Sequence, residues 1–324
     1  MELLTELLGF TLKIALVVVA GLVLIAAIAR SQGVREGGLR VVDWGARWMQ
    51  YRARLLQPRQ AKQAKKLAKS AKKLAKSDMQ GTLWVLVFNG DMRVSNLKGL
   101  RESISAIIMA ADPKTDQVCV RLKSPGGGVS EYGLAASQLI RLRDAGLRLT
   151  VAVEGVAASG GYMMAVVADH IVAAPFAAVG SIGVVAQVPN FHRALKKADI
   201  DVEVLTAGKH KRTLTLLGEN TEEGREKFKQ DLDQIHSLFK AFVVQYRPQL
   251  DLEQVAEGDV WFGQDALSVG LIDEVGQIDD WLMQQSETQA VLEVRYELPK
   301  TLGTWLGRGV HALAVQLREW LWTK

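Results

Sequence analysis

Two stretches of the chain place small and nucleophilic residues where an apolar strand pattern ends. ASGGYMMA sets Ser159 between Ala158 and two glycines, and SPGGG (residues 124–128) follows the apolar run QVCVRLK. Glycines leave room for a substrate backbone, and the free N–H groups at the start of a helix can stabilise an oxyanion. The pattern is that of a nucleophilic serine, although each motif alone is also typical of a helix cap or a strand-end loop.

A serine nucleophile needs a general base. The sequence has five histidines, and none stands in a context typical of a catalytic triad. A lysine can act as the base where burial or neighbouring cations lower its pKa. TAGKHKRTLT supplies Lys209 and Lys211 with Arg212 beside them, although this stretch taken alone favours a solvated basic loop.

Five motifs in order resemble peptidase family S49, the signal peptide peptidases. They are SPGGGV, ASGGYMMA, GSIGVV, GKHK followed by TEEGREKF, and WFGQDALSVGLIDEVG, and the resemblance covers nearly the whole chain. It implies a ClpP/crotonase-like α/β fold, with a parallel sheet and crossover helices, preceded by an N-terminal transmembrane helix. It also implies a serine peptidase that needs no cofactor and no metal.

The resemblance implies a Ser–Lys dyad in which Ser159 is the nucleophile and Lys211 the general base. Gly126 and Gly160 match the family's oxyanion donors, and Ser181 in GSIG matches a serine that orients the lysine. In this family the subunits form a ring and neighbours share the dyad. We therefore expect a homo-oligomer that hydrolyses peptides or unfolded proteins, with signal-peptide remnants and misfolded envelope proteins as candidate substrates.

Two other functions compete with the peptidase. A crotonase-like acyl-CoA enzyme would share the oxyanion hole without needing Ser159 or Lys211, and the predicted membrane anchor argues against it. A noncatalytic membrane scaffold would keep only the fold, and the presence of both dyad residues argues against that. Nothing in the sequence favours a nucleic-acid partner, because the basic residues are confined to one segment.

The N-terminal sequence predicts a membrane anchor in residues 1–30. Residues 7–29 carry one charge, Lys13, and about 20 apolar residues span a bilayer. The run ends in AIA, as at a signal-peptidase site, but two glutamates precede it, whereas a cleaved signal peptide prefers a basic start. The basic residues that follow favour a cytoplasmic catalytic domain. The family places that domain on the outer face of the bacterial inner membrane, and we expect the periplasmic orientation.

Positive charge is concentrated after the anchor. Residues 30–78 hold fourteen Lys and Arg against three acidic residues, while the whole chain has a net charge of +5. The repeat KKLAKSAKKLAKS spaces Ala and Leu as in a weak coiled-coil seam. Residues 31–80 are therefore predicted to form a solvated basic helical neck, with attraction to anionic lipid or contact between subunits as alternatives.

From residue 81 onward, strand and helix patterns alternate, which predicts a parallel sheet. The apolar stretch 163–188 is interrupted by charged residues, proline and glycine, so we interpret it as core rather than a second membrane span. Cys119, the one cysteine, is expected to be buried. The protease domain is expected at 81–290, followed by a C-terminal strand and amphipathic helix at 291–324. Expected strands are 82–88, 117–123, 147–155, 170–174 and 181–188. Expected helices are 100–111, 130–146, one within 157–169 that opens at its glycines, and a long one that Asn220 and Glu223 would cap.

Overall fold

The computed structural model describes residues 37–74, 79 and 81–297 of the chain. Contacts divide the chain into one unit of residues 41–295 and a second of residues 1–40 with 296–324. The first unit holds all the predicted site residues. The predicted anchor and the C-terminal amphipathic helix lie outside the described residues, and no helix among the described ones is long and apolar enough to cross a membrane.

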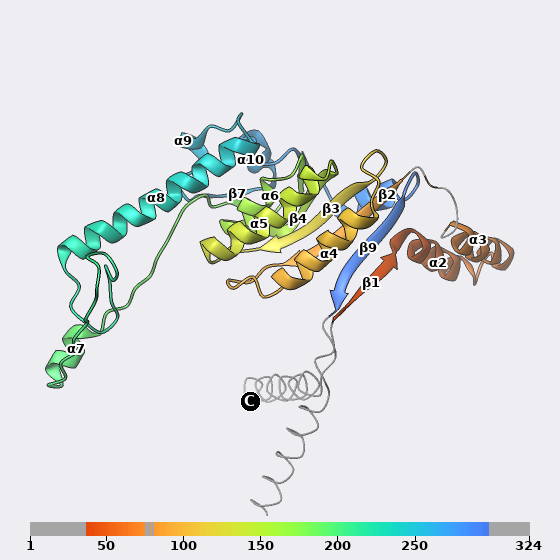
Figure 1. The fold of residues 1–324 in the computed structure, drawn as a ribbon. Coiled ribbons are helices and arrows are strands. Elements are labelled where there is room, and N and C mark those ends of the chain that lie inside the picture. The colour runs from red at the N-terminus through yellow and green to blue at the C-terminus, as the bar shows by residue number, and fades with distance from the viewer. Residues whose placement is uncertain (1–36, 75–78, 80, 298–324) are drawn as a thin grey trace, which may run out of the picture. The chain divides into compact units, whose positions relative to one another are not determined.

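The described residues form a nine-stranded sheet. The strands are β1 (Gly38–Asp43), β2 (Thr82–Asn89), β3 (Gln117–Ser124), β4 (Arg148–Ala158), β5 (His170–Ala173), β6 (Ala178–Gly180), β7 (Val260–Phe262), β8 (Glu274–Val275) and β9 (Ala290–Glu297). Their order is β1-β9-β2-β3-β4-β5-β8, with β6 pairing with β4 and β7. Figure 1 shows the central strands β2, β3 and β4 next to one another. Pairing is parallel from β9 through β8 and between β4 and β6. The prediction of a parallel sheet with crossover helices is confirmed.

The helices are α2 (Trp44–Leu56), α3 (Ala61–Leu74), α4 (Leu97–Ala110), α5 (Val129–Asp144), α6 (Gly160–Ala165), α7 (His192–Lys197), α8 (Glu222–Tyr246), α9 (Leu252–Val255), α10 (Gly263–Ser268) and α11 (Ile278–Gln285). Figure 1 shows α4 and α5 side by side on one face of the sheet. Each connects two neighbouring parallel strands, α4 between β2 and β3 and α5 between β3 and β4, as the crossover rule requires.

Alternate residues of the central strands face two apolar cores. On β3, Val118 and Val120 belong to the larger core, formed with α4, α5 and α6, while Cys119 between them belongs to the smaller one. Trp44 of α2 and Trp281 of α11 pack against the smaller core. This two-residue alternation on a strand buried on both faces is why the strands appear as nearly continuous apolar runs in the sequence.

Cys119 offers a chemical probe of this packing. Its side chain is fully buried, and burial raises the pKa of the thiol to about 12. The thiolate is the reactive form, so at pH 8 only about one thiol in 10⁴ is ionised. We expect iodoacetamide to leave Cys119 unmodified in the folded protein and to alkylate it fully in denaturant, as measured by intact mass. Rapid alkylation of the folded protein would contradict its placement in the core.

The predicted strand at residues 181–188 is wrong. β6 ends at Gly180, and Ser181 takes a φ of +50° and donates its N–H to the carbonyl of Asp259 at 2.7 Å. The positive φ of Ser181 ends the strand there, one residue beyond the last register pair of β6 with β7. Val185 beyond the turn is 91% exposed. The prediction of a core strand rested on the apolar composition of this segment, and apolar composition does not show that a segment is buried.

The predicted long helix is confirmed as α8, but its predicted cap is wrong. Thr221 caps the helix by accepting the N–H of Gly224 at 3.1 Å. Asn220 instead accepts the N–H of Thr215 at 2.8 Å, within the preceding loop. Asn220 and Thr221 are neighbouring polar residues at the helix start, and the conformation of the loop determines which of them is the N-cap.

Candidate active site

Three parallel strands end at one edge of the sheet and bring three motifs together. β3 ends at Ser124, β4 at Ala158 and β6 at Gly180, and the strand register pairs Ala158 with Gly180. The SPGG, ASGG and GSIG stretches lie at these ends. Ligands collect at the carboxyl ends of parallel strands in open α/β sheets, so this edge is the candidate site.

Ser159 occupies a strained turn between β4 and α6. Its φ is 51° and its ψ is −119°, a conformation that costs a non-glycine residue roughly 1–3 kcal/mol. Its N–H donates to the carbonyl of Gly180 at 2.8 Å, and its carbonyl accepts the N–H of Met163 at 2.9 Å. The side chain makes no helix-capping hydrogen bond. The turn is therefore fixed through the backbone, and the hydroxyl does not serve as a helix cap.

Gly126 and Gly160 lie directly against Ser159. A Cβ added to Gly126 would come within 2.8 Å of the Ser159 Cβ and 2.9 Å of the Gly160 nitrogen, and Gly126 has a φ of +89°. The Gly160 N–H begins α6, and no acceptor for it lies among the described residues. The Gly126 N–H donates to Ser124 Oγ at 3.2 Å, so this donor would have to be shared or released to reach an oxyanion.

Tyr132, which the sequence motifs do not reveal, supports both glycines. It is fully buried in the first turn of α5, and a Cβ on Gly160 would overlap its ring. Its hydroxyl lies 2.5 Å from Ser124 Oγ and donates to the carbonyl of Asp91 at 2.9 Å. Burial raises the pKa of this phenol, which keeps it protonated. Its position in the first turn of the helix after SPGGG is the signal that could have identified it.

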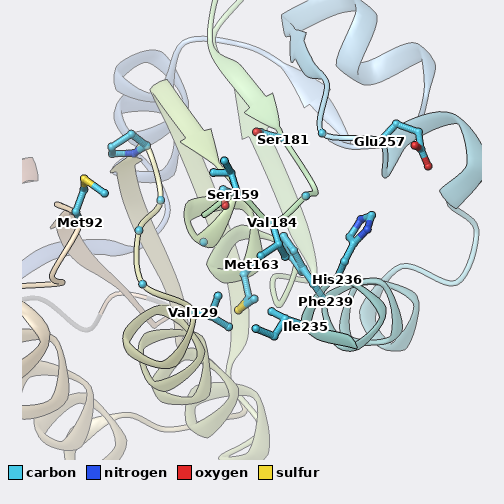
Figure 2. Close-up of a pocket in the computed structure, with 18 residues that line it drawn as sticks. Met92, Val129, Ser159, Met163, Ser181, Val184, Ile235, His236, Phe239 and Glu257 are labelled. Atoms are coloured by element: carbon cyan, nitrogen blue, oxygen red, sulfur yellow. The ribbon is translucent and has the colours of Figure 1, made fainter. Parts of the chain in front are cut away.

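Ser159 opens into a cavity of about 970 Å³. Figure 2 shows the serine between Met92 on one side and His236 and Phe239 of α8 on the other. Ser181 lines the same cavity. The cavity is at the upper end of the size range of small-ligand pockets. Its apolar lining is Met92, Pro125, Val129, Met163, Val184, Val185, Ile235 and Phe239.

Lys211 does not line this cavity. It is exposed in the loop between α7 and α8, where its N–H donates to the carbonyl of Gly208 at 3.1 Å. Its neighbour Lys209 pairs at 2.8 Å with Glu223 in the first turn of α8. The cavity residue Ile235 comes twelve residues after Glu223 on this helix, which is about 18 Å along its axis. The described chain therefore does not bring Lys211 to Ser159.

His236 and Glu257 are the titratable side chains among the described residues that line the cavity. The His236 Nε2 lies 3.2 Å from the carbonyl oxygen of Ile182. Figure 2 shows the His236 ring on the Glu257 side of the cavity, and no hydrogen bond joins it to Ser159 among the described contacts. The histidine thus holds the loop after Ser181 against α8 and does not form a dyad with the serine.

The chain is similar to known peptidases over most of its length. The family model described as Peptidase family S49 matches residues 141–292, and the one described as Peptidase family S49 N-terminal matches residues 2–139. "Probable protease SohB" of Haemophilus influenzae is 53% identical over 240 residues, 74% of this chain and 68% of that protein. "Probable protease SohB" of Buchnera aphidicola subsp. Acyrthosiphon pisum is 54% identical over 214 residues, 66% of this chain and 63% of that protein.

Among solved structures, one similar chain is a mutant of the "1510-N membrane-bound stomatin-specific protease". It is 14% identical, with a TM-score of 0.42, over 63% of this chain and 84% of that chain.

Proposed function

The chain belongs to peptidase family S49, and from this premise we propose that it is a serine endopeptidase with a Ser159–Lys211 dyad. The observation that carries the proposal is the strained turn at Ser159. Its side chain makes no capping bond, and the residue lies against Gly126 and Gly160 at the mouth of an apolar cavity. A backbone strain held at a cavity by neighbouring strands is typical of a positioned nucleophile.

In the proposed reaction, neutral Lys211 takes the proton of Ser159 Oγ as that oxygen attacks a peptide carbonyl carbon. The N–H groups of Gly126 and Gly160 stabilise the resulting oxyanion. The C–N bond then breaks, the leaving amine takes the proton from the lysine, and an acyl-enzyme remains. Lys211 next takes a proton from a water molecule as its oxygen attacks the ester carbon; the bond to Ser159 Oγ then breaks, and this oxygen takes the proton back from Lys211. The Ser181 hydroxyl orients the lysine amine in this scheme.

We place the catalytic lysine on a neighbouring copy in a homo-oligomeric ring. Two observations support this assignment. Lys211 is absent from the cavity of its own chain, and the segment between Ser181 and α8 exposes apolar side chains that a partner surface could cover. Examples are Val185 at 91%, Phe191 at 54% and Leu205 at 88% exposure.

We propose peptides and unfolded proteins as the substrates, with signal-peptide remnants and misfolded envelope proteins as the biological source. The apolar cavity walls suit apolar side chains on the peptide. In this proposal the apolar run at residues 7–29 anchors the chain in the bacterial inner membrane, with the catalytic domain in the periplasm.

Covalent labelling tests the proposed nucleophile. Detergent-purified full chain, Ser159→Ala and Lys211→Ala would each be treated with a fluorophosphonate probe, and the adduct located by mass spectrometry. We expect an adduct on Ser159 of the wild type and none in either variant. Strong Ser159 labelling in Lys211→Ala would show that another group is the base. A folded, oligomeric wild type that resists both this probe and a smaller sulfonyl fluoride would favour the scaffold or the acyl-CoA enzyme.

Tyr132→Phe is expected to lower kcat for peptide hydrolysis about tenfold, with KM changed little. The variant keeps the ring against Gly160 but removes the hydroxyl that holds Ser124, to which the Gly126 N–H donates. We also expect a loss of about 1–2 kcal/mol in unfolding free energy, since buried polar groups lose a partner.

Tyr51→Phe is the matched control, because Tyr51 is 43% exposed on α2 and does not line the cavity. Steady-state kinetics and denaturant titration of both variants measure these effects. An unchanged kcat in Tyr132→Phe would show that the phenol does not position the oxyanion loop.

A further inference from the structure

Helices α2 and α3 form a hairpin whose charged side chains are all basic. The two helices pack against each other, and the sequence from Trp44 to Leu74 contains ten Lys and Arg and no Asp or Glu. Lysines three and four positions apart on α3, such as Lys62, Lys65 and Lys69, repel one another. The helix therefore keeps a charge arrangement that is unfavourable unless an anionic surface compensates it.

The cations at residues 47–69, whose side chains the structure describes, have no ionic partner among the described residues. Other arginines of the same unit, such as Arg121 and Arg247, pair with carboxylates. The exposed, unpaired cations of the hairpin include Arg52, Arg54, Arg59, Lys62, Lys65, Lys66 and Lys69.

The apolar side of the hairpin is already occupied by the protein. Trp44 and Trp48 pack on the smaller core, and Trp44 Nε1 donates to the buried Glu293 at 2.7 Å. The Arg121 guanidinium lies 5.4 Å from the centroid of the Trp44 ring. On α3, Ala64 is buried. The hairpin is thus fastened through its aromatic and small residues and presents its cations to solvent.

We propose that this basic hairpin binds the anionic headgroups of a lipid bilayer. Clusters of four to eight basic residues close to a membrane segment attract anionic lipids. The apolar run ends at residue 29, and Trp44 follows fifteen residues later, so the hairpin begins within about 50 Å of an anchored end even for a fully extended chain.

Two other partners fit the surface less well. Single-stranded nucleic acid needs several exposed aromatic rings for base stacking. In the hairpin, α3 has no aromatic residue and Trp44 and Trp48 face the core, while Tyr51 on α2 is exposed but already has the Arg47 guanidinium over its ring. A second copy of the hairpin would add ten like charges to the first, which disfavours self-association. The inference does not depend on the proposed peptidase chemistry.

Hydrogen exchange of the full chain in lipid nanodiscs tests this inference. Discs of phosphatidylcholine alone would be compared with discs containing 30% phosphatidylglycerol. We expect amide exchange in residues 44–70 to slow on the order of fivefold or more in the anionic discs, as even one bound lysine would give. The protection should vanish at 0.5 M NaCl, because headgroup attraction is screened by salt.

Variants that remove charges distinguish lipid binding by the hairpin from lipid binding by the rest of the protein surface. Lys62→Gln with Lys65→Gln and Lys69→Gln should weaken the protection markedly, because seven of the ten basic residues remain, while Arg101→Gln with Lys114→Gln and Lys229→Gln should leave it unchanged, since these three exposed residues lie outside the hairpin. Equal exchange in both kinds of disc would overturn the proposal. So would protection that appears with added single-stranded RNA and not with phosphatidylglycerol.

Discussion

Replacing Ser159 by alanine is expected to abolish peptide hydrolysis, with kcat falling by at least about 10⁴-fold. Stability should not fall, because the side chain makes no capping bond and the turn is held by backbone bonds to Gly180 and Met163. Steady-state hydrolysis of a fluorogenic peptide and a thermal melt of the same preparation measure the two effects. Substantial residual hydrolysis by the alanine variant would remove Ser159 from the mechanism.

Ser159→Gly separates strain from chemistry at the same position. Glycine tolerates a φ of 51° without a Cβ penalty, so this variant should be as inactive as alanine but more stable, by about 1 kcal/mol. A melting temperature below that of Ser159→Ala would contradict the view that the fold stores strain at this turn.

Lys211→Ala is expected to lower kcat by about 10²–10⁴-fold, the range typical of a lost general base. The fold of each copy should stay as stable as in wild type, because within its own chain the side chain is exposed and the backbone bond to Gly208 remains; the oligomeric state is measured alongside, so that loss of the base is distinguished from loss of the ring. The same hydrolysis assay, a thermal melt and light scattering would measure these properties.

Lys209→Ala is the matched control for Lys211. Lys209 lies two residues away and pairs on the surface with Glu223, so its loss should leave hydrolysis nearly unchanged. Equal losses in the two variants would point to a general effect of the basic loop, and a fully active Lys211→Ala would exclude this lysine as the base.

The fold could be predicted from the sequence wherever burial on both faces dictated the residue pattern. β3 is an example: Val118, Cys119 and Val120 are apolar because two cores lie on either side of the sheet. The prediction failed at residues 181–188, where the chain is apolar but turns out of the sheet at Ser181. An apolar segment can pack against a partner protein as well as in the core of its own chain. The periodicity of the sequence does not distinguish these two environments.

The candidate site could be predicted only in part. Ser159, Gly126, Gly160 and Ser181 are each marked by a local motif at a strand end, and strand pairing brings these ends together. Tyr132 supports them from another element through contacts that no local motif records.

The walls contributed by α8 also escaped the sequence motifs. Ile235 and Phe239 have the four-residue spacing of any amphipathic helix, and His236 lies beside them, so their place in the cavity wall depends on how the helix packs against the sheet. The location of Lys211 relative to Ser159 is a property of chain packing too, and sequence spacing does not determine it.

The most direct test of the account mixes two inactive variants. Ser159→Ala and Lys211→Ala chains carrying different tags would be co-expressed, and oligomers that contain both would be isolated through the two tags in turn. If neighbouring copies supply the serine and the lysine, random assembly restores both residues in about a quarter of the sites, and hydrolysis should return to about that fraction of wild type. Mixed oligomers with no hydrolysis above the separate variants would contradict a dyad shared between copies.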